Sequence, residues 1–316
     1  MAELPKVAYV FPGQGSQSTG MGSDLYNSYP SAKEVFAEAD ASLGFSLSRL
    51  CFEGPEEELK KTHNVQPAIL VVSIACLKAL EESAIANFPP PTFVAGHSLG
   101  EYTALVAAGV LGLTDAVLLV RERGRLMYEA GLKNPGSMLA VIGLDEETVK
   151  DISFHSGTEI SNINCPGQIV VSGAAQALAE ADKLARIKGA RALIPLRVSG
   201  AFHSALIEPV LAEFSKIVSN FRFQPPVIPV ISNVTARPLT DVDSIKEELV
   251  KQLRNCIQWQ RSVEYMMHSG VTTFYEMGPG RVLTGLIRRI NSELQILNIS
   301  GVEDITQLAY KESPTN

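Results

Sequence analysis

Residues 92–109, TFVAGHSLGEYTALVAAG, constrain the fold more than any other part of this chain. A short β-branched and aromatic run ends in Gly-His-Ser-Leu-Gly and passes directly into an alanine-rich helical pattern. This order of strand, tight turn and helix is the context that the G-x-S-x-G nucleophile elbow requires. It predicts an α/β fold in which Ser98 sits on a strained turn at the end of a sheet. Gly96 and Gly100 flank that turn, where a Cβ would collide with the opposing strand or helix.

A plain glycine turn is the alternative to a catalytic elbow, because the chain contains 24 glycines. The flanking strand and helix favour the catalytic interpretation, with Ser98 as the nucleophile. We interpret the adjacent His97 as structural, since neighbouring side chains on a sharp turn diverge. Shaping the pocket is its alternative role.

Size and composition limit the classes of function that this chain can have. A length of 316 residues suits one large domain with a smaller insertion. A composition of 46% hydrophobic and 19% charged residues is typical of a globular protein. A net charge of −7 argues against general nucleic-acid binding. The four cysteines lack C-x-x-C or metal-ligand spacing, and residues 68–80, the most apolar stretch, are too few to span a bilayer. We expect a cytoplasmic monomer without a metal site that binds neither nucleic acid nor membrane.

A glycine loop, PGQGSQ, follows the expected buried strand Val7–Phe11. A Rossmann loop needs glycine where Ser18 stands, and a P-loop needs Lys and then Ser or Thr where Met21 and Gly22 stand. Both nucleotide loops are therefore excluded. Beside the elbow, the backbone amide of Gln14 would join that of Leu99 as an oxyanion hole. A plain tight turn fits the same residues equally well.

An arginine interrupts the apolar face of the next helical pattern, residues 114–130, for which Thr114 is the expected N-cap. At about 100° per residue, Arg123 and Met127 fall on the same face as Ala116, Leu119 and Val120. A buried guanidinium needs a carboxylate partner, which either the protein or a ligand supplies. Helix geometry leaves these two alternatives open, as well as a snorkelling side chain that needs no buried partner.

Residues 136–197 change in pattern and predict the order β-α-β-β-α-β of a ferredoxin-like domain. We therefore expect an α/β-hydrolase-like domain with a parallel sheet, residues 1–129 and 198–316, into which a small ferredoxin-like domain, residues 130–197, is inserted. In the large domain we expect an apolar helix from Gln66-Pro67 to Leu80. We also expect a strand at 227–233 and helices at 244–255, 260–268 and 282–290.

His203 lies in SGAFHSAL, where the chain leaves the small domain. A lone histidine is more often structural, but a serine nucleophile needs a base. Ordinary α/β-hydrolases place this histidine near the C-terminus after an acidic residue, whereas more than a hundred residues follow His203 here. The order of residues thus differs from that of a standard esterase.

Together these motifs resemble the malonyl-CoA:acyl-carrier-protein transacylases of fatty-acid synthesis and the related acyltransferase domains of polyketide synthases. The resemblance extends from Val7 to about Ile290. It rests on FPGQGSQ, QPAI, GHSLGEY, an arginine twenty-five residues after Ser98, NCPGQIVVSG, GAFHS, SNVTA and EMGPGRVLTGL.

The resemblance implies roles for individual residues. Ser98 would accept the acyl group, and His203 would act as general base and acid. The backbone amides of Gln14 and Leu99 would form the oxyanion hole. Arg123 would pair with the free carboxylate of the malonyl group.

Further site residues follow from the same resemblance. The backbone carbonyl of Gln252 would orient the histidine in place of an aspartate. Phe202 would occupy the space that a 2-methyl group needs, which implies malonyl rather than methylmalonyl groups. Gln66, Met127 and Asn162 would contribute to the substrate pocket.

The implied function is transfer of malonyl from malonyl-CoA to the phosphopantetheine thiol of acyl carrier protein through a malonyl-serine, without a bound cofactor. A trans-acting polyketide acyltransferase and a serine thioesterase or esterase are the alternatives. The clustered Arg288 and Arg289 are candidates for docking the acidic carrier protein.

Overall fold

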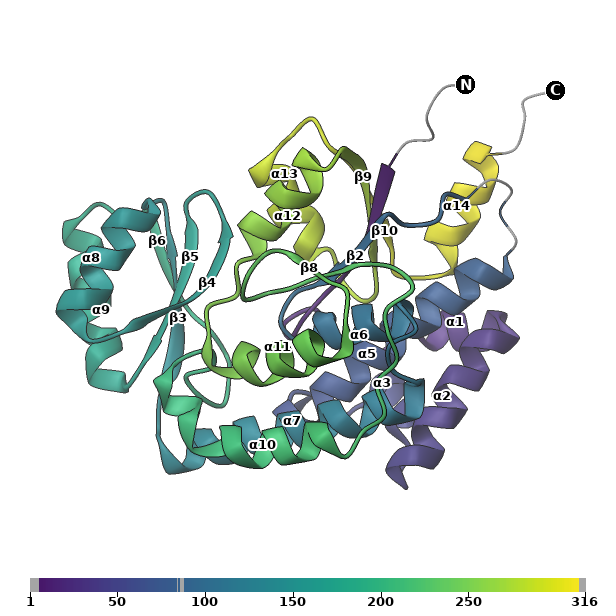
Figure 1. The fold of residues 1–316 in the computed structure, drawn as a ribbon, viewed down its shortest axis with the longest axis horizontal. Helices are drawn as coiled ribbons and strands as arrows, with labels where there is room; N and C mark the ends of the chain where they lie inside the picture. The colour runs from purple at the N-terminus through teal and green to yellow at the C-terminus, as the bar shows by residue number, and fades with distance from the viewer. Residues whose placement is uncertain (1–5, 84, 86–87, 313–316) are drawn as a thin grey trace.

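The structure of the protein, a computed structural model, describes residues 6–83, 85 and 88–312 (Figure 1). It consists of a large part built on a six-stranded sheet and a small part built on a four-stranded sheet. In Figure 1 the small part lies at the left, away from both termini. The mixed α/β class predicted from the sequence is confirmed.

The large sheet has the strand order β10-β9-β1-β2-β7-β8. The pairs from β10 to β7 are parallel, and β8 pairs antiparallel with β7. Its strands are Lys6–Phe11 (β1), Phe93–Gly96 (β2), Val230–Ile231 (β7), Pro238–Leu239 (β8), Val271–Met277 (β9) and Gln295–Ile299 (β10). Phe11 lies opposite Gly96, so the loops that follow β1 and β2 leave the sheet side by side.

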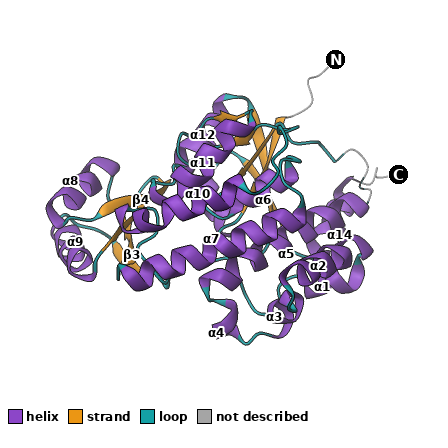
Figure 2. Cartoon of the chain, turned by 60° about the horizontal axis from the view of Figure 1, so that its bottom comes forward, coloured by secondary structure: helices purple, strands orange, loops and turns teal. Residues whose placement is uncertain are grey.

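Helices cover both faces of this sheet, as the ribbon coloured by secondary structure shows (Figure 2). They are α1 (Ser23–Ser28), α2 (Pro30–Leu43), α3 (Leu47–Glu53), α4 (Glu56–Leu59), α5 (Thr62–Glu82), α6 (Gly100–Ala107), α7 (Leu113–Lys133), the 3₁₀ helix η1 (Ala205–Val210), α10 (Leu211–Ser219), α11 (Val242–Arg254), α12 (Trp259–His268), α13 (Val282–Ile290) and α14 (Val302–Glu312). Side chains of β1 alternate between the two layers. Val7, Tyr9 and Phe11 enter the core with α5 to α7, whereas Ala8 and Val10 enter the core with α12 and α13.

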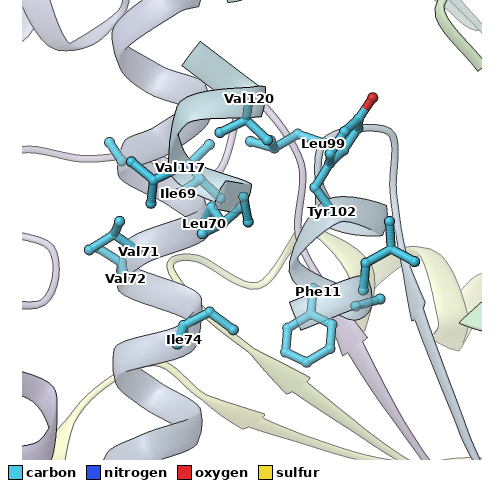
Figure 3. Close-up of a cluster of buried hydrophobic side chains, with 14 of the residues drawn as sticks. Phe11, Ile69, Leu70, Val71, Val72, Ile74, Leu99, Tyr102, Val117 and Val120 are labelled. Carbon is cyan, nitrogen blue, oxygen red and sulfur yellow. The ribbon is translucent and has the colours of Figure 1, made fainter. Parts of the chain in front are cut away.

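The main core lies between α5, α6 and α7 (Figure 3). Ile69 and Leu70 of α5 meet Val117 and Val120 of α7, and all four are fully buried. Burying an aliphatic side chain of this size stabilises a fold by about 1.5–3 kcal/mol. This packing fixes two helices of the site. Helix α6 begins two residues after Ser98, and α7 carries Arg123.

Helix α5 differs from its predicted form, because it begins at Thr62 and contains Pro67 in its interior. Pro67 cannot donate to the carbonyl of His63. Arg121 Nη1 donates to that carbonyl instead, at 2.7 Å, so the helix continues through the proline. With 21 residues, α5 is long and apolar enough to cross a membrane, contrary to the prediction from residues 68–80. Its apolar window is 89% buried in the protein, which is the environment of a core helix.

Two other predictions for the large part need correction. Helix α7 begins at Leu113 with Gly112 as its N-cap, and Thr114 instead donates to Glu38 Oε1. Only Val230–Ile231 of the predicted strand 227–233 is paired, because its neighbours β2 and β8 each pair with it over these two residues alone. Strand β10 and helix α14 were not expected. The helices predicted at 244–255, 260–268 and 282–290 are confirmed to within two residues.

The small part has the predicted order of elements. They are β3 (Ser137–Ile142), α8 (Glu146–Ser156), β4 (Glu159–Cys165), β5 (Gln168–Gly173), α9 (Ala175–Ile187) and β6 (Ala192–Pro195). The sheet order β4-β5-β3-β6, antiparallel throughout, is that of a ferredoxin-like fold. Helix α7 runs from the large part to β3 (Figure 2), and thus crosses the predicted boundary at residue 130. The boundaries at 130 and 197 stay a prediction.

The small sheet has two different faces. Leu139 and Val141 of β3 pack against α8 and α9, whereas Met138 and Ala140 join the core of the large part. This alternation follows from the two-residue period of a strand. The second face therefore forms a wall opposite the carboxyl end of the large sheet, where the nucleophile elbow lies.

Candidate active site

Ser98 occupies a strained turn between β2 and α6, with a φ of 52°. The flanking glycines allow this turn. A Cβ on Gly96 would lie 1.8 Å from the backbone carbon of Gly100, and one on Gly100 would lie 2.1 Å from the carbonyl oxygen of Phe11. Neither distance is compatible with a side chain, so the predicted collisions are present in the structure.

His203 lies beside the serine, although 105 positions separate them in sequence. Its Nε2 is 2.9 Å from Ser98 Oγ, and its Nδ1 is 2.7 Å from the backbone oxygen of Gln252. Because a carbonyl only accepts, Nδ1 carries the proton and Nε2 presents its lone pair to the hydroxyl. The histidine also has a positive φ, 56°, and its backbone N–H donates to Leu253 O, so its position is fixed from two sides.

The environment of His203 favours its neutral form. Burial first, and the charge of Arg123 second, lower the pKa of His203 to about 3 from its ordinary value of 6.5. A neutral imidazole with a free Nε2 lone pair can remove a proton from Ser98 at neutral pH.

Arg123 is buried on α7 with 1% of its surface exposed, as its place on the apolar face predicts. Its Nη1 donates to Gln66 Oε1 at 2.9 Å, and its Nη2 donates to Gln252 Oε1 at 2.7 Å and to Ser98 Oγ at 3.0 Å. The guanidinium carbon lies 5.2 Å from the ring centre of Tyr102. Within the described residues no carboxylate forms an ion pair with it, so the first of the two alternatives for its partner is not realised.

The rest of α7 confirms the predicted division of its faces. Met127, one turn after Arg123, is buried, whereas Arg125 lies half-exposed and pairs with Glu122, Glu129 and Glu213. Arg123 is thus a buried cation held by neutral dipoles, while its neighbour is an ordinary surface cation.

A cavity of about 210 Å³ opens at Ser98 between the large and small parts. Most predicted site residues line it: Gln14, Ser98, Leu99, Arg123, Met127, Asn162, Phe202 and His203. Met138, Ala140 and Val170 of the small sheet supply its apolar wall. The cavity therefore has a reactive, charged end and an apolar side.

Two predicted residues lie behind the cavity instead of lining it. Gln66 accepts from Arg123, and its Nε2 is 3.4 Å from Met127 Sδ. Gln252 contacts His203 through its backbone and Arg123 through its side chain. A direct contact of Gln66 with substrate stays a prediction.

The candidate oxyanion amides lie on adjacent loops. Gln14 follows β1 and Leu99 follows the elbow, and a Cβ on Gly13 would come within 2.4 Å of His97 O, which shows how closely the loops approach. Within the described part of the chain, neither the Gln14 N–H nor the Leu99 N–H has an acceptor. The N–H of Ser98 is occupied, because it donates to Asn233 Oδ1 at 2.6 Å.

Sequence reasoning assigned no role to several polar residues around the elbow. Asn233 bridges Gly96 O and the Ser98 N–H, and Glu101, 0% exposed, accepts from the Asn233 N–H. Both residues belong to motifs that carried the family resemblance, GHSLGEY and SNVTA. The signal available in the sequence was Glu101 itself, an acidic residue in the first turn of an apolar helix.

His97 lies in the cavity wall, where its Nε2 is 2.8 Å from Asn164 Oδ1. This position fits the pocket-shaping alternative for His97. It does not place the imidazole next to the Ser98 hydroxyl, which His203 and Arg123 already contact.

This chain is similar to known acyltransferases over most of its length. Residues 8–307 match the family described as acyl transferase domain. The malonyl CoA-acyl carrier protein transacylase of Bacillus subtilis (strain 168) is 45% identical over 307 residues, which cover 96% of this chain and 96% of the relative. The chain belongs to the malonyl CoA-acyl carrier protein transacylase family.

Solved transacylases have the same fold. An acyl carrier protein S-malonyltransferase from Vibrio cholerae O1 matches with a TM-score of 0.92 at 40% identity, over 96% of this chain and 99% of that chain. The structure of a type II PKS acyl-carrier protein in complex with its malonyl-transacylase contains a match with a TM-score of 0.91 at 38% identity, over 97% and 99%. The family resemblance predicted from the motifs is confirmed.

Proposed function

We propose that this transacylase transfers the malonyl group from malonyl-CoA to the phosphopantetheine thiol of acyl carrier protein, through a malonyl ester on Ser98. The observation that carries this proposal is Arg123, a buried guanidinium 3.0 Å from the Ser98 hydroxyl with no carboxylate partner among the described residues. Arg suits bidentate binding of a carboxylate, and a substrate with a free carboxylate would supply the missing anion.

The first half-reaction follows from this geometry. The malonyl carboxylate binds Arg123, and the thioester oxygen faces the N–H groups of Gln14 and Leu99. Ser98 Oγ attacks the thioester carbon while His203 Nε2 takes the hydroxyl proton. The two amides stabilise the charge on the tetrahedral oxygen. When the carbon–sulfur bond breaks, the imidazolium returns the proton to the sulfur and coenzyme A leaves as a thiol.

The second half-reaction reverses these steps. The phosphopantetheine thiol of the carrier gives its proton to His203 and attacks the ester carbon, and Ser98 regains its proton as the carbon–oxygen bond breaks. Serine, histidine, arginine and backbone amides supply every group in both halves, so the proposal needs no bound cofactor. One product leaves before the second substrate binds, which predicts ping-pong kinetics.

Intact-mass spectrometry tests this proposal directly. Incubation with malonyl-CoA alone should add roughly 86 Da to the protein, the mass of a malonyl ester formed by covalent catalysis, and Ser98→Ala should add nothing. Holo carrier protein should then remove the adduct, whereas carrier protein without phosphopantetheine should leave it in place. An adduct that persists in Ser98→Ala, or its absence in the wild type, would overturn the proposal.

A thioesterase would share Ser98 and His203 but would release the acyl group to water. Comparing malonate release with carrier loading over the same time separates the two activities.

A polyketide carrier is the second candidate acceptor, favoured by the match to the solved complex with a type II PKS carrier protein. Parallel assays with a fatty-acid carrier and a polyketide carrier decide between them.

Carrier docking is proposed for the last turn of α13, which contains Arg288 and Arg289. Reversing both charges should raise the KM for the carrier about tenfold and leave the KM for malonyl-CoA unchanged, because complementary charge mainly steers association. Arg186→Glu, on the exposed face of α9, is the control. An unchanged KM for the carrier would exclude this surface.

Cytoplasmic location and a monomeric state stay predictions of the sequence.

A further inference from the structure

Gln252 occupies a central position in the site that its backbone contact with His203 does not explain. Its side chain is 0% exposed and lies behind both Ser98 and Arg123. The amide Nε2 donates to Ser98 O at 2.8 Å and also to Glu101 Oε2. The amide Oε1 accepts from Arg123 Nη2 at 2.7 Å.

These partners determine which way the amide points. A glutamine has donors on one end and an acceptor on the other. Two acceptors, the Ser98 carbonyl and the Glu101 carboxylate, lie at one end, so the nitrogen must face them. The oxygen then faces Arg123, which can only donate. A reversed amide would place N–H groups against the guanidinium.

Glu101 is itself held in place. Its Oε1 accepts from the backbone N–H of Asn233 at 2.9 Å, and Asn233 bridges Gly96 O and the Ser98 N–H. Both carboxylate oxygens therefore accept from an N–H. Burial and the neighbouring Glu248 raise the pKa of Glu101, and the charge of Arg123 acts in the opposite direction.

Arg123 has few other restraints on its reactive end. Gln66 holds Nη1, and Nε is buried without a hydrogen-bond partner. Apart from Ser98 Oγ, which must move during the reaction, Gln252 Oε1 is the acceptor that Nη2 contacts in the described residues. The ring of Tyr102, 5.2 Å from the guanidinium carbon, also packs against this group. Among the described residues, Gln252 Oε1 is therefore the acceptor that can keep Nη2 directed while Ser98 Oγ reacts.

We propose that the side-chain amide of Gln252, oriented by Glu101, is a positioning group that aims Arg123 at the acyl carboxylate and so sets the preference for malonyl over acetyl groups. The inference rests on the proposed malonyl transfer. It gives Gln252 two separable functions, because the backbone carbonyl serves His203 while the side chain serves Arg123.

Gln252→Met separates these functions. Methionine keeps the backbone carbonyl and the length of the side chain but removes the amide. We expect kcat/KM for malonyl-CoA to fall about 10- to 100-fold, the range for losing a hydrogen bond to a charged group, with most of the loss in KM. Transfer from acetyl-CoA, which has no carboxylate for Arg123, should fall less than about threefold. Equal losses for both donors would mean a structural role and overturn the inference.

Glu101→Gln provides a second test that keeps the amide of Gln252. A glutamine at 101 has one acceptor oxygen for two N–H donors, so the Gln252 amide loses its fixed orientation in part of the molecules. The malonyl-over-acetyl ratio should fall in the same direction as in Gln252→Met, and an unchanged ratio in a folded Glu101→Gln protein would contradict the inference.

Glu248→Gln is the matched control. Glu248 is buried beside Glu101, and its Oε1 accepts from the Val234 N–H at 2.9 Å. A glutamine can keep that bond and donate to Glu101, and it removes the neighbouring charge that raises the pKa of Glu101, so Glu101 keeps both acceptor oxygens and the malonyl-over-acetyl ratio should not fall. Circular dichroism confirms that each variant is folded. Wild-type protein that transfers malonyl supports the proposed function whatever the variants do, so failure of the two proposals can be distinguished.

Discussion

The Nη2 of Arg123 donates to the Oγ of Ser98 at 3.0 Å, although 25 positions separate the two residues in sequence. The nucleophile and the cation are thus joined by one hydrogen bond. The separation is short enough that an acyl chain bonded to Ser98 would carry its distal carboxylate past the guanidinium. The group that reacts, Ser98, and the group that selects the acyl chain, Arg123, therefore lie next to each other in the site.

Arg123→Ala should abolish selection of the malonyl group. We expect kcat/KM for malonyl-CoA to fall about 100- to 1000-fold, since truncating one partner of a buried charge pair costs about 2–5 kcal/mol. Use of acetyl-CoA should be unchanged or improved. Steady-state assays with both donors measure this. Arg125→Ala, which removes a surface arginine two residues away, is the control and should preserve the donor ratio. Equal losses for malonyl and acetyl donors in Arg123→Ala would refute the assigned role.

The pH dependence should reflect the depressed pKa of His203. With a pKa of about 3 in the folded enzyme, the imidazole stays neutral well below 6.5. Single-turnover acylation of Ser98 by malonyl-CoA should therefore lack the acid limb near pH 6.5 that an ordinary histidine produces. Rapid-quench mass spectrometry between about pH 5 and pH 8 tests this range. A half-maximal rate near pH 6.5 would contradict the burial effect.

The same shift predicts how stability changes with pH. Between about pH 3 and 6.5 the unfolded chain binds a proton at His203 that the folded chain does not bind, so this histidine makes unfolding easier as the pH falls through that window. Thermal melts of wild type and His203→Gln compare the two cases. The stability of His203→Gln relative to wild type should rise as the pH is lowered, and a constant difference would exclude the effect.

Phe202 should restrict branched acyl groups, since it lies in the cavity wall and is buried. Phe202→Leu opens space for a 2-methyl group, and methylmalonyl transfer relative to malonyl transfer should rise about tenfold, the lower range for one carbon in a pocket. Phe214→Leu on α10, equally buried but away from the cavity, controls for lost packing. If both variants leave the ratio unchanged, Phe202 does not determine this selectivity.

Two glycines should respond oppositely to alanine. Gly96→Ala should prevent folding of the elbow, because its Cβ would lie 1.8 Å from Gly100 C. Gly285→Ala places a Cβ on α13 where no heavy atom lies within 4 Å, and should stabilise the protein by about 0.4–1 kcal/mol through reduced entropy of the unfolded chain. Soluble yield and denaturant melts measure both effects. A stable Gly96→Ala protein would show that the turn can relax.

The sequence predicted those features that depend on short stretches of chain. The elbow at Ser98, the apolar face of α7 and the β-α-β-β-α-β order each follow from local spacing, because helix and strand periods act on neighbouring residues. The motifs also predicted the family, since several of them occur in a fixed order over most of the chain. The start of α5 before Pro67 is a local feature that the sequence did not predict. Pro67 lies inside α5 because Arg121, which is distant in sequence, satisfies the carbonyl that the proline leaves free.

Only the tertiary structure decided which residues meet behind the elbow. Glu101, Asn233 and Gln252 come from three separate elements, and no local pattern connects their polar atoms. Their positions depend on the packing of α6 and α11 beside the sheet that contains β7, which brings Glu101 next to residues more than a hundred positions later in the chain. Periodicity can place Arg123 on a buried face, but the absence of a carboxylate partner among the described residues is a property of the folded interior. That unpaired charge is what gives the site its preference in our proposal.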